Sequence, residues 1–189
     1  MVDSVTISNK TMTIPGDQEI WHAAGFKANL KDTLPTALER HVVLVAPRVH
    51  WNTGNIGRTC VGAGAGLHLI RPLGFSLEER QVKRAGLDYW HLVKPTVWDD
   101  IDAFWVHTAP ATEELALLTK RGRHTIWRMP RGKRLFLLLG SETDGLPPQL
   151  LSRFAAQTYR IPITDKIRSL NLSTAAGIAL YESLRPAVP

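Results

Sequence analysis

The sequence predicts an α/β fold in which a mainly parallel sheet is flanked by helices. Two continuous apolar runs, residues 41–46 and 134–139, are typical of strands that are buried on both faces of a sheet. Segments with strand and helix patterns alternate from the first run onward, which favours parallel strands joined by helices. We therefore expect one domain over residues 41–189, preceded by a variable N-terminal extension over residues 1–40.

Shorter patterns predict the remaining elements. In chain order we expect a helix over residues 59–65, a strand over 67–71, a basic helix from Ser76 to Gly86 that opens with a capping box, a strand over 91–94, helical fragments over 99–104 and 112–115, a strand over 115–119, a helix over 148–154, a strand over 158–161 and a terminal helix from Leu172. The terminal helix has an apolar face that we assign to the core, and Asn171 or Ser169 is suited to cap it.

The composition of the chain limits the classes of function that it can have. The chain of 189 residues has 23 Lys+Arg against 17 Asp+Glu and a pI near 9.8, which fits a polyanionic partner such as nucleic acid, although many basic proteins bind none. Its single cysteine, Cys60, excludes an internal disulfide and favours a reducing, cytoplasmic location. No apolar run approaches the length of a membrane span, no signal peptide is evident, and no histidine pair has metal-ligand spacing.

Three polar, glycine-bearing loops follow predicted strands, at residues 47–58, 140–147 and 162–173. Ligands of open parallel sheets bind at the carboxyl ends of the strands, so we expect the three loops to converge on one site. A structural reading stays open for each loop, because a capped turn or helix start needs the same residue types.

The first two loops offer distinct chemistry. Asn52, Asn55 and Arg58 stand in the first, and a guanidinium can grip phosphate with two hydrogen bonds. The alternative is a helix N-cap at Asn52 or Thr53 with a solvated arginine. In the second loop, Gly140 lets a ligand approach the backbone, and Glu142 lies at the lip of the sheet.

Other motifs are weaker. Glycines 62, 64 and 66 lack the dinucleotide-binding spacing and favour a helix terminus. A basic stretch surrounds Trp127 and either contacts an RNA backbone or forms a solvated loop; its cations are Arg121, Arg123, Arg128, Arg131, Lys133 and Arg134.

Taken together, the segments NTGNIGR (52–58), LGSETDGLP (139–147) and IPI…RSLNLS (161–173) resemble the three motifs of the SPOUT-class RNA ribose 2′-O-methyltransferases. The stretch RAGLDY (84–89) is similar to the short, single-domain branch that methylates the ribose of the wobble nucleotide, a cytidine or uridine at position 34 of tRNA. The resemblance covers the chain from about His41 to Arg185.

The resemblance implies a deep C-terminal trefoil knot, S-adenosylmethionine bound in the knot, tRNA as substrate, and a homodimer formed through the C-terminal helix. A row of Ser173, Gly177 and Tyr181 would face the partner subunit. By position, the cofactor pocket is implied to include Leu118, Gly140, Ile161, Ser169 and Leu170, and the active site Asn52, Arg58, Glu142, Asn171 and Ser173. The chain departs from the family pattern in its residues 1–40 and at Asp144, where the family often carries an arginine that would contact RNA.

The favoured hypothesis for Arg58 is a clamp on the phosphate next to the target ribose, because arginine stays protonated and is a poor general base. Glu142 and Asn171 would orient Arg58 and the ribose. Two alternatives remain open: methylation of another tRNA position or of rRNA, and an RNA-binding protein without catalysis. Calorimetry with S-adenosylmethionine separates a catalytically silent protein with a degraded pocket from an enzyme.

Overall fold

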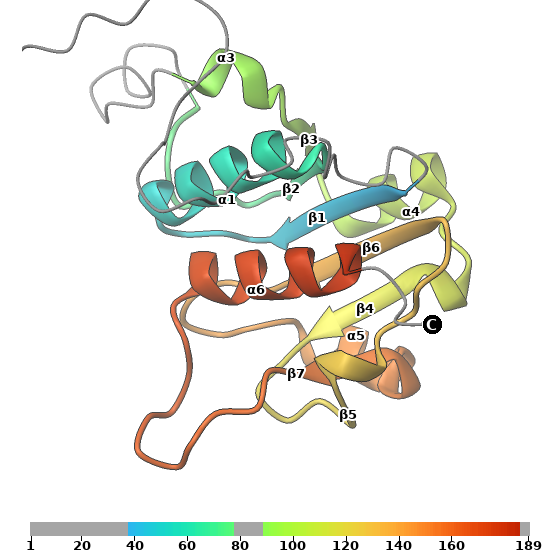
Figure 1. The fold of residues 1–189 in the computed structure, drawn as a ribbon. Helices are drawn as coiled ribbons and strands as arrows, with labels where there is room; N and C mark the ends of the chain where they lie inside the picture. Colours follow the sequence, from blue (N-terminus) through green and yellow to red (C-terminus); the bar gives the residue numbers. More distant parts are fainter. Residues whose placement is uncertain (1–37, 78–88, 186–189) are drawn as a thin grey trace, which may run out of the picture. The chain divides into compact units, whose positions relative to one another are not determined.

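The computed structural model describes residues 38–77 and 89–185. Their core is a seven-stranded sheet in the order β3-β2-β1-β6-β4-β7-β5, in which every neighbouring pair is parallel (Figure 1). The strands are β1 (Glu39–Val45), β2 (Gly66–Ile70), β3 (Thr96–Trp98), β4 (Leu115–Leu118), β5 (His124–Thr125), β6 (Arg134–Leu139) and β7 (Thr158–Arg160). The predicted α/β class and parallel sheet are confirmed.

Helices cover both faces of this sheet. The α-helices are α1 (His50–Ala63), α3 (Trp90–Val93), α4 (Ile101–Thr108), α5 (Pro148–Arg153) and α6 (Leu172–Leu184), and the 3-10 turns are η1 (Thr112–Glu114), η2 (Ile126–Arg128) and η3 (Ala155–Gln157). Alternate residues of the central strands point to opposite faces. Leu135 and Leu137 of β6 pack in one core cluster with α1, α6 and η2, whereas Phe136 and Leu138 pack in another with α4 and α5.

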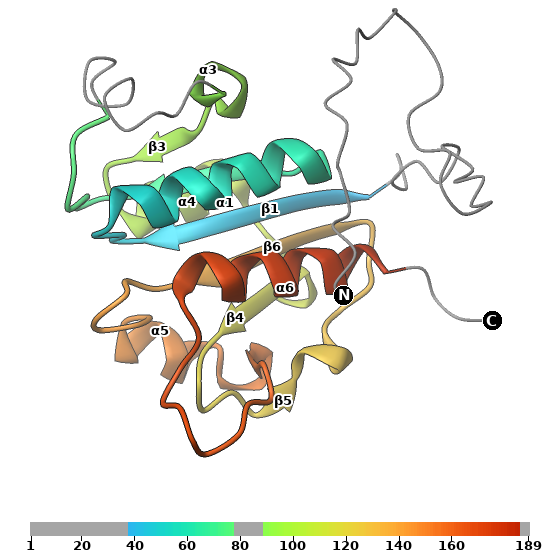
Figure 2. The ribbon, with the colours of Figure 1, turned by 60° about the vertical axis from the view of Figure 1, so that its left-hand side comes forward.

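Helix α6 lies beside α1 and over the two central strands, as both ribbon views show (Figures 1 and 2). Asn171 is its N-cap, and its side-chain oxygen accepts bonds from the backbone N–H groups of Ser173 and Thr174. The predicted apolar face of this helix is confirmed as core, since Ala176, Ala179 and Leu180 are all buried. The chain leaves β7 near the edge of the sheet and returns to its middle through residues 161–171.

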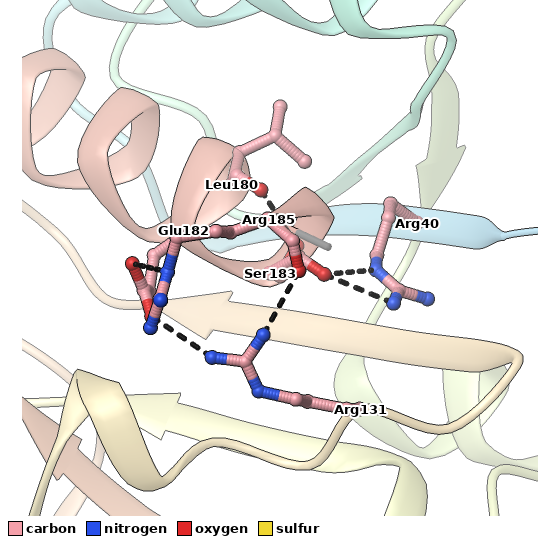
Figure 3. A network of polar contacts seen from close by, with 6 residues as sticks. All are labelled: Arg40, Arg131, Leu180, Glu182, Ser183 and Arg185. Atoms are coloured by element: carbon pink, nitrogen blue, oxygen red, sulfur yellow. Dashed lines mark hydrogen bonds and ion pairs between the residues drawn. The ribbon is translucent and has the colours of Figure 1, made fainter. Parts of the chain in front are cut away.

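The end of α6 is tied to the start of β1 by a buried guanidinium (Figure 3). Arg40, which is 2% exposed, donates to the carbonyl oxygen of Ser183 at 3.1 and 3.3 Å, and to those of Gly132 and Lys133 at 3.1 and 2.9 Å. Burial lowers the pKa of Arg40 from its ordinary value. No carboxylate is needed to satisfy this group, because its donors meet backbone carbonyls.

Several sequence predictions need correction. The strand expected at residues 91–94 is wrong: the segment forms α3, which ends where Lys94 takes the left-handed conformation with φ of 43°. The helix expected from residue 59 begins already at His50, with Val49 and not Asn52 or Thr53 as its N-cap; it ends at the left-handed Gly64, a confirmed glycine terminus.

The short strands β3 and β5 were not predicted, because two or three residues carry no readable alternation. Most of the predicted basic helix from Ser76 to Gly86, and of the stretch at 84–89, lies outside the described residues, as do residues 1–37. Among the residues that the structure describes, no helix is both long and apolar enough to cross a membrane.

Candidate active site

A cavity of about 1070 Å³ opens where β1, β4 and β6 end and α6 begins. The three polar loops predicted to converge all contribute to it. Its lining comprises Val49, Trp51, Asn52, Asn55, Thr119, Lys120, residues 140–146, Leu151 and residues 167–175. The position agrees with the rule that parallel sheets bind ligands at the carboxyl ends of their strands.

Glu142 joins the second loop to the start of α1. One carboxylate oxygen accepts the backbone N–H of Arg48 at 2.9 Å, and the other accepts the N–H of Val49 at 3.3 Å and the side-chain amide of Asn52 at 3.0 Å. These N–H groups lie at the beginning of a helix, where a negative charge is stabilised by unpaired donors and the helix dipole. Both oxygens of Glu142 therefore have donors before any ligand binds.

Two asparagines extend this contact into the third loop. Asn52, which is 6% exposed, accepts from the side-chain N–H of Asn171 at 3.0 Å. The side-chain oxygen of Asn171 accepts the N–H and hydroxyl of Ser173, at 2.8 and 2.7 Å. A carboxylate only accepts hydrogen bonds and a backbone N–H only donates them. The two ends of this series, the carboxylate of Glu142 and the N–H of Ser173, therefore determine how both asparagine amides are oriented. Glu142, Asn52, Asn171 and Ser173 form one directional series, here called the amide relay.

The second loop is a tight turn closed on itself. The N–H of Gly145 donates to the carbonyl of Ser141 at 3.0 Å, and Gly145 has φ of 72°. A Cβ on Gly140 would lie about 2 Å from the backbone of Gly145 and Leu146. Residue 140 must therefore be glycine, because the backbone of Gly145 and Leu146 fills the space that a side chain would need. The same backbone fills the space that the sequence suggested for a ligand.

Asp144 takes part in an ion pair at the cavity. The guanidinium of Arg48 donates to its carboxylate at 2.6 Å, and the hydroxyl of Thr143 donates to the same oxygen at 3.1 Å. Both charged side chains are more than half exposed, so the pair contributes little to stability. Position 144 thus carries an acid where the family often carries an arginine, and Arg48 from the neighbouring loop places a cation beside it.

Arg58 is not among the residues that line the cavity. It is exposed on α1, and its guanidinium lies 4.1 Å from the ring centre of Tyr89. It lies six positions after Asn52 in the helix, which turns its side chain about 120° away from that of Asn52 on the helix surface. The structure therefore separates Arg58 from the four relay residues with which it was grouped.

Seven of the ten predicted site residues line the cavity: Asn52, Gly140, Glu142, Ser169, Leu170, Asn171 and Ser173. Besides Arg58, Leu118 and Ile161 do not; they are partly buried and pack against the core. Trp51 and Lys120 line it and were not predicted. Lys120 follows the end of β4 by two residues, and that position was its available signal.

Within residues 38–77 and 89–185, no group of three His, Cys, Asp or Glu side chains is arranged to hold a metal ion. The cavity offers apolar surface at Leu146, Leu151 and Leu170, carboxylates at Glu142 and Asp144, and cations at Lys120 and Arg168. This mixture suits a ligand that combines an apolar ring with charged groups of both signs.

A parallel α/β domain with such a cavity is typical of enzymes that bind nucleotide-like ligands. The model of the SpoU rRNA Methylase family matches residues 39–181, and the chain belongs to this family. A Listeria innocua protein provisionally named tRNA (cytidine(34)-2′-O)-methyltransferase is 46% identical over 151 residues, which cover 78% of this chain and 88% of the relative.

Two solved structures extend the comparison. One, described as giving insights into the 2-OH methylation of C/U34 on tRNA, has a TM-score of 0.70 at 39% identity and covers 78% of this chain and 95% of its own. The other, an AdoMet-bound rRNA methyltransferase from Sinorhizobium meliloti, has a TM-score of 0.62 at 30% identity and covers 82% of this chain and 59% of its own.

Proposed function

We propose that the protein is an S-adenosylmethionine-dependent methyltransferase that modifies the ribose 2′-hydroxyl of nucleotide 34 in tRNA. Membership of the family and the two relatives whose names specify position 34 support the reaction and the substrate. The observation in this chain that carries the proposal is the amide relay, which directs a fixed set of donors and acceptors into a cavity of suitable size.

The residues of the cavity fit S-adenosylmethionine. We assign Leu146 and Leu170 to the adenine ring, and Lys120 or Arg168 to the carboxylate of the amino acid part. Ser169 would contact the cofactor through its polar groups, while Leu118 and Ile161 would support the pocket wall from behind. When bound, S-adenosylmethionine supplies a methyl group activated by a sulfonium sulfur.

The relay residues position the ribose in this proposal. The hydroxyl proton of Ser173 is committed to Asn171, so the lone pairs of its oxygen can accept a ribose hydroxyl. Glu142 already accepts three bonds and is better suited to hold Asn52 and the start of α1 than to remove a proton. Orientation of the nucleophile is the contribution that such a rigid series can make to the rate.

A clamp role for Arg58 requires a second copy of the chain, or a phosphate that reaches the outer face of α1. We propose a homodimer through the α1 and α6 faces, where Trp51 and Tyr181 are exposed by 62% and 50%. Ser173, Gly177 and Tyr181 would lie within this interface; a Cβ on Gly177 would approach Thr59 of α1 at 3.9 Å, which places that residue beside α1. Mixing Arg58→Ala and Glu142→Ala subunits restores activity only if one site uses both chains.

Three finer points belong to the same proposal. The return of residues 161–171 from the sheet edge to its middle is compatible with a trefoil knot closed by α6. A cytoplasmic location follows from a tRNA substrate and a single, buried cysteine. Residues 1–40 would form an extension to the catalytic domain that influences the choice of RNA.

Methyl transfer to defined RNAs tests the proposal. The protein is incubated with labelled S-adenosylmethionine and tRNA transcripts, and the modified nucleotide is located by nuclease digestion and mass spectrometry. We expect one methyl group on the ribose of nucleotide 34, and none when that nucleotide carries a 2′-deoxyribose. Methylation of rRNA or of another tRNA position would show that nucleotide 34 is not the target. Binding of the cofactor without transfer to any RNA would indicate an RNA-binding protein without catalysis.

A further inference from the structure

The basic stretch around Trp127 is divided by the fold into two halves with different partners. Arg131, Lys133 and Arg134 lie before or at the start of β6 and have carboxylate partners: Glu182 at 3.2 Å, Glu39 at 3.5 Å and Glu114 at 2.6 Å. The other half comprises Arg121, Arg123 and Arg128, and Lys120 directly precedes it; all four side chains are exposed. None of these four forms an ion pair with any carboxylate in residues 38–77 and 89–185.

Two of the four cations stand at the tip of a rigid turn. Gly122 donates its N–H to the carbonyl of Thr119 at 3.1 Å, and Thr119 donates its own to Tyr159 at 2.9 Å, so Lys120 and Arg121 occupy the turn between them. A Cβ on Gly122 would lie 2.2 Å from the carbonyl carbon of Tyr159, which shows how closely the turn is pressed against β7.

The guanidinium of Arg160 holds the same turn from the side of β7. It donates to the carbonyl oxygens of Gly122 and Arg123 at 2.7 and 3.2 Å. The N–H of Arg123 donates in addition to the hydroxyl of Thr158 at 3.0 Å. Because this backbone is already held in place, binding of an anion orders only the side chains of the cations and not the loop that carries them.

This turn is continuous with the candidate active site and with an exposed aromatic side chain. Lys120 lines the cavity, and Arg168 lines it from the loop before α6. Trp127, on η2 directly after β5, is 60% exposed, although its neighbours Ile126 and Met129 are buried and fix the turn that carries it. Between Leu115 and Ser141 the chain contains no acidic residue.

We propose that Arg121, Arg123, Trp127 and Arg128, here called the basic edge, form the surface that holds the RNA strand outside the cavity. The guanidinium groups bind successive phosphates, and a base outside the cavity stacks on Trp127. The proposal rests on the proposed function for the identity of the polyanion. An acidic protein partner would use the cations without needing a stacking aromatic, so the role of Trp127 separates the two.

Equilibrium binding of a fluorescent anticodon stem-loop RNA tests the surface without relying on catalysis. For the double variant Arg121→Ala/Arg123→Ala we expect the Kd to rise at least tenfold. The slope of log Kd against log salt should fall by about 1.4, which is the loss of two phosphate contacts. Trp127→Ala should weaken binding roughly tenfold, and Trp127→Phe should recover most of the loss.

Lys133→Ala is the matched control, because it removes a cation of the same stretch that is 75% exposed but paired with Glu39. Its Kd for the RNA should change less than twofold, and calorimetry with S-adenosylmethionine should give the same affinity in all four variants. Thermal unfolding of each variant verifies that it is folded, and Arg121→Glu/Arg123→Glu gives a second reading of the charge effect.

The outcomes are separable from those of the function test. If the wild-type chain methylates RNA but the basic-edge variants bind RNA as tightly as Lys133→Ala, the surface proposal is wrong and the function stands. If the chain transfers no methyl group yet the variants lose RNA binding, the surface stands without the reaction. Weakening by charge removal with no effect of Trp127→Ala would overturn the stacking of a base on Trp127 and leave a purely electrostatic contact, which any polyanion could make.

Discussion

The two ends of the parallel strands hold polar networks of opposite character. At the carboxyl end the amide relay is built from two neutral amides and one hydroxyl anchored on Glu142, and it borders a cavity of about 1070 Å³. At the amino end the groups are ionic: Arg40 and Arg131 bind carbonyls and a carboxylate at the end of α6 (Figure 3). The first network orients side chains that line the cavity, whereas the second fastens a helix to a sheet.

The comparison teaches that both ends of one helix can be fixed for different purposes. Asn171 at the start of α6 caps the helix and passes its remaining donor to Asn52. Near its end, the backbone carbonyl of Ser183 accepts from Arg40, while the hydroxyl of Ser183 donates back to the carbonyl of Leu180 at 2.6 Å. Changes to the arginines at the amino end of the strands should therefore lower stability and leave the site intact. Changes to the amide relay should alter the site and change stability little.

The largest effect on stability is expected for Arg40→Met, which keeps the apolar stem and removes the guanidinium. Carbonyl oxygens of Ser183, Gly132 and Lys133 would lose their donor in a buried region, and we expect the free energy of unfolding to fall by about 3 kcal/mol. Urea denaturation measures this value. Arg131→Met, at a partly exposed pair, should cost less than about 1 kcal/mol; equal losses for both variants would contradict the special role of Arg40.

A smaller effect, which depends on pH, is expected from the pair formed by His41, which is partly buried, and His68, which is buried. Trp98 donates to Nδ1 of His68 at 3.1 Å, so the proton of His68 lies on Nε2 and points to Nδ1 of His41 at 3.0 Å. Burial, followed by the neighbouring His41, lowers the pKa of His68 to about 4. The folded chain thus keeps His68 neutral at pH values where the unfolded chain, with a pKa near 6.5, binds a proton.

The free energy of unfolding should therefore fall as the pH falls from about 6.5 to 4, by roughly 1.4 kcal/mol per pH unit once the unfolded chain is protonated. Burial also lowers the pKa of His41, which acts in the same direction. Urea titrations at pH 7.5 and at pH 5.5, above the range of most carboxylates, measure the change. The variant His68→Gln should show a flatter pH dependence; a slope equal to that of the wild type would rule out His68 as its source.

The smallest change in stability, with a large change in activity, is expected for Asn171→Asp. Aspartate caps a helix as well as asparagine does, so the free energy of unfolding should fall only by the lost bond to Asn52, about 1 kcal/mol. It cannot donate to Asn52, however, and in either orientation of Asn52 one oxygen would then face another oxygen. We expect single-turnover methyl transfer to slow by about 100-fold. Asn171→Ala should be as slow and less stable, while wild-type rates in Asn171→Asp would remove the relay from the mechanism.

The sequence was most informative where burial imposes a pattern. Continuous apolar runs identified β1 and β6, and the spacing of apolar residues identified α6, with Asn171 as one of two candidate caps. Segments of two to four residues have no such pattern, so β3 and β5 were missed and α3 was predicted as a strand. The convergence of three loops followed from the topology of parallel sheets. The seven site residues that line the cavity follow instead from the resemblance to the SPOUT-class enzymes.

Details of the candidate site could not be predicted because they depend on angles and partners. The start of α1 at His50 decides that Asn52 faces the cavity and that Arg58 does not, since each residue turns a helix by about 100°. Similarly, nothing in the basic stretch distinguishes Arg131 from Arg121 until Glu182 is brought beside one of them. This difference is determined by contacts between residues that lie more than 50 positions apart in the sequence, such as Arg131 and Glu182.

The bond between Asn52 and Asn171 spans 119 positions of the chain and has a consequence for synthesis. During translation the first strands and α1 leave the ribosome well before the residues that complete the relay. A chain that terminates ahead of Asn171 could already contain the central strands, yet it would lack the group that orients Asn52. Premature products would thus be unable to modify RNA, and the appearance of activity in a refolding mixture would mark the docking of α6.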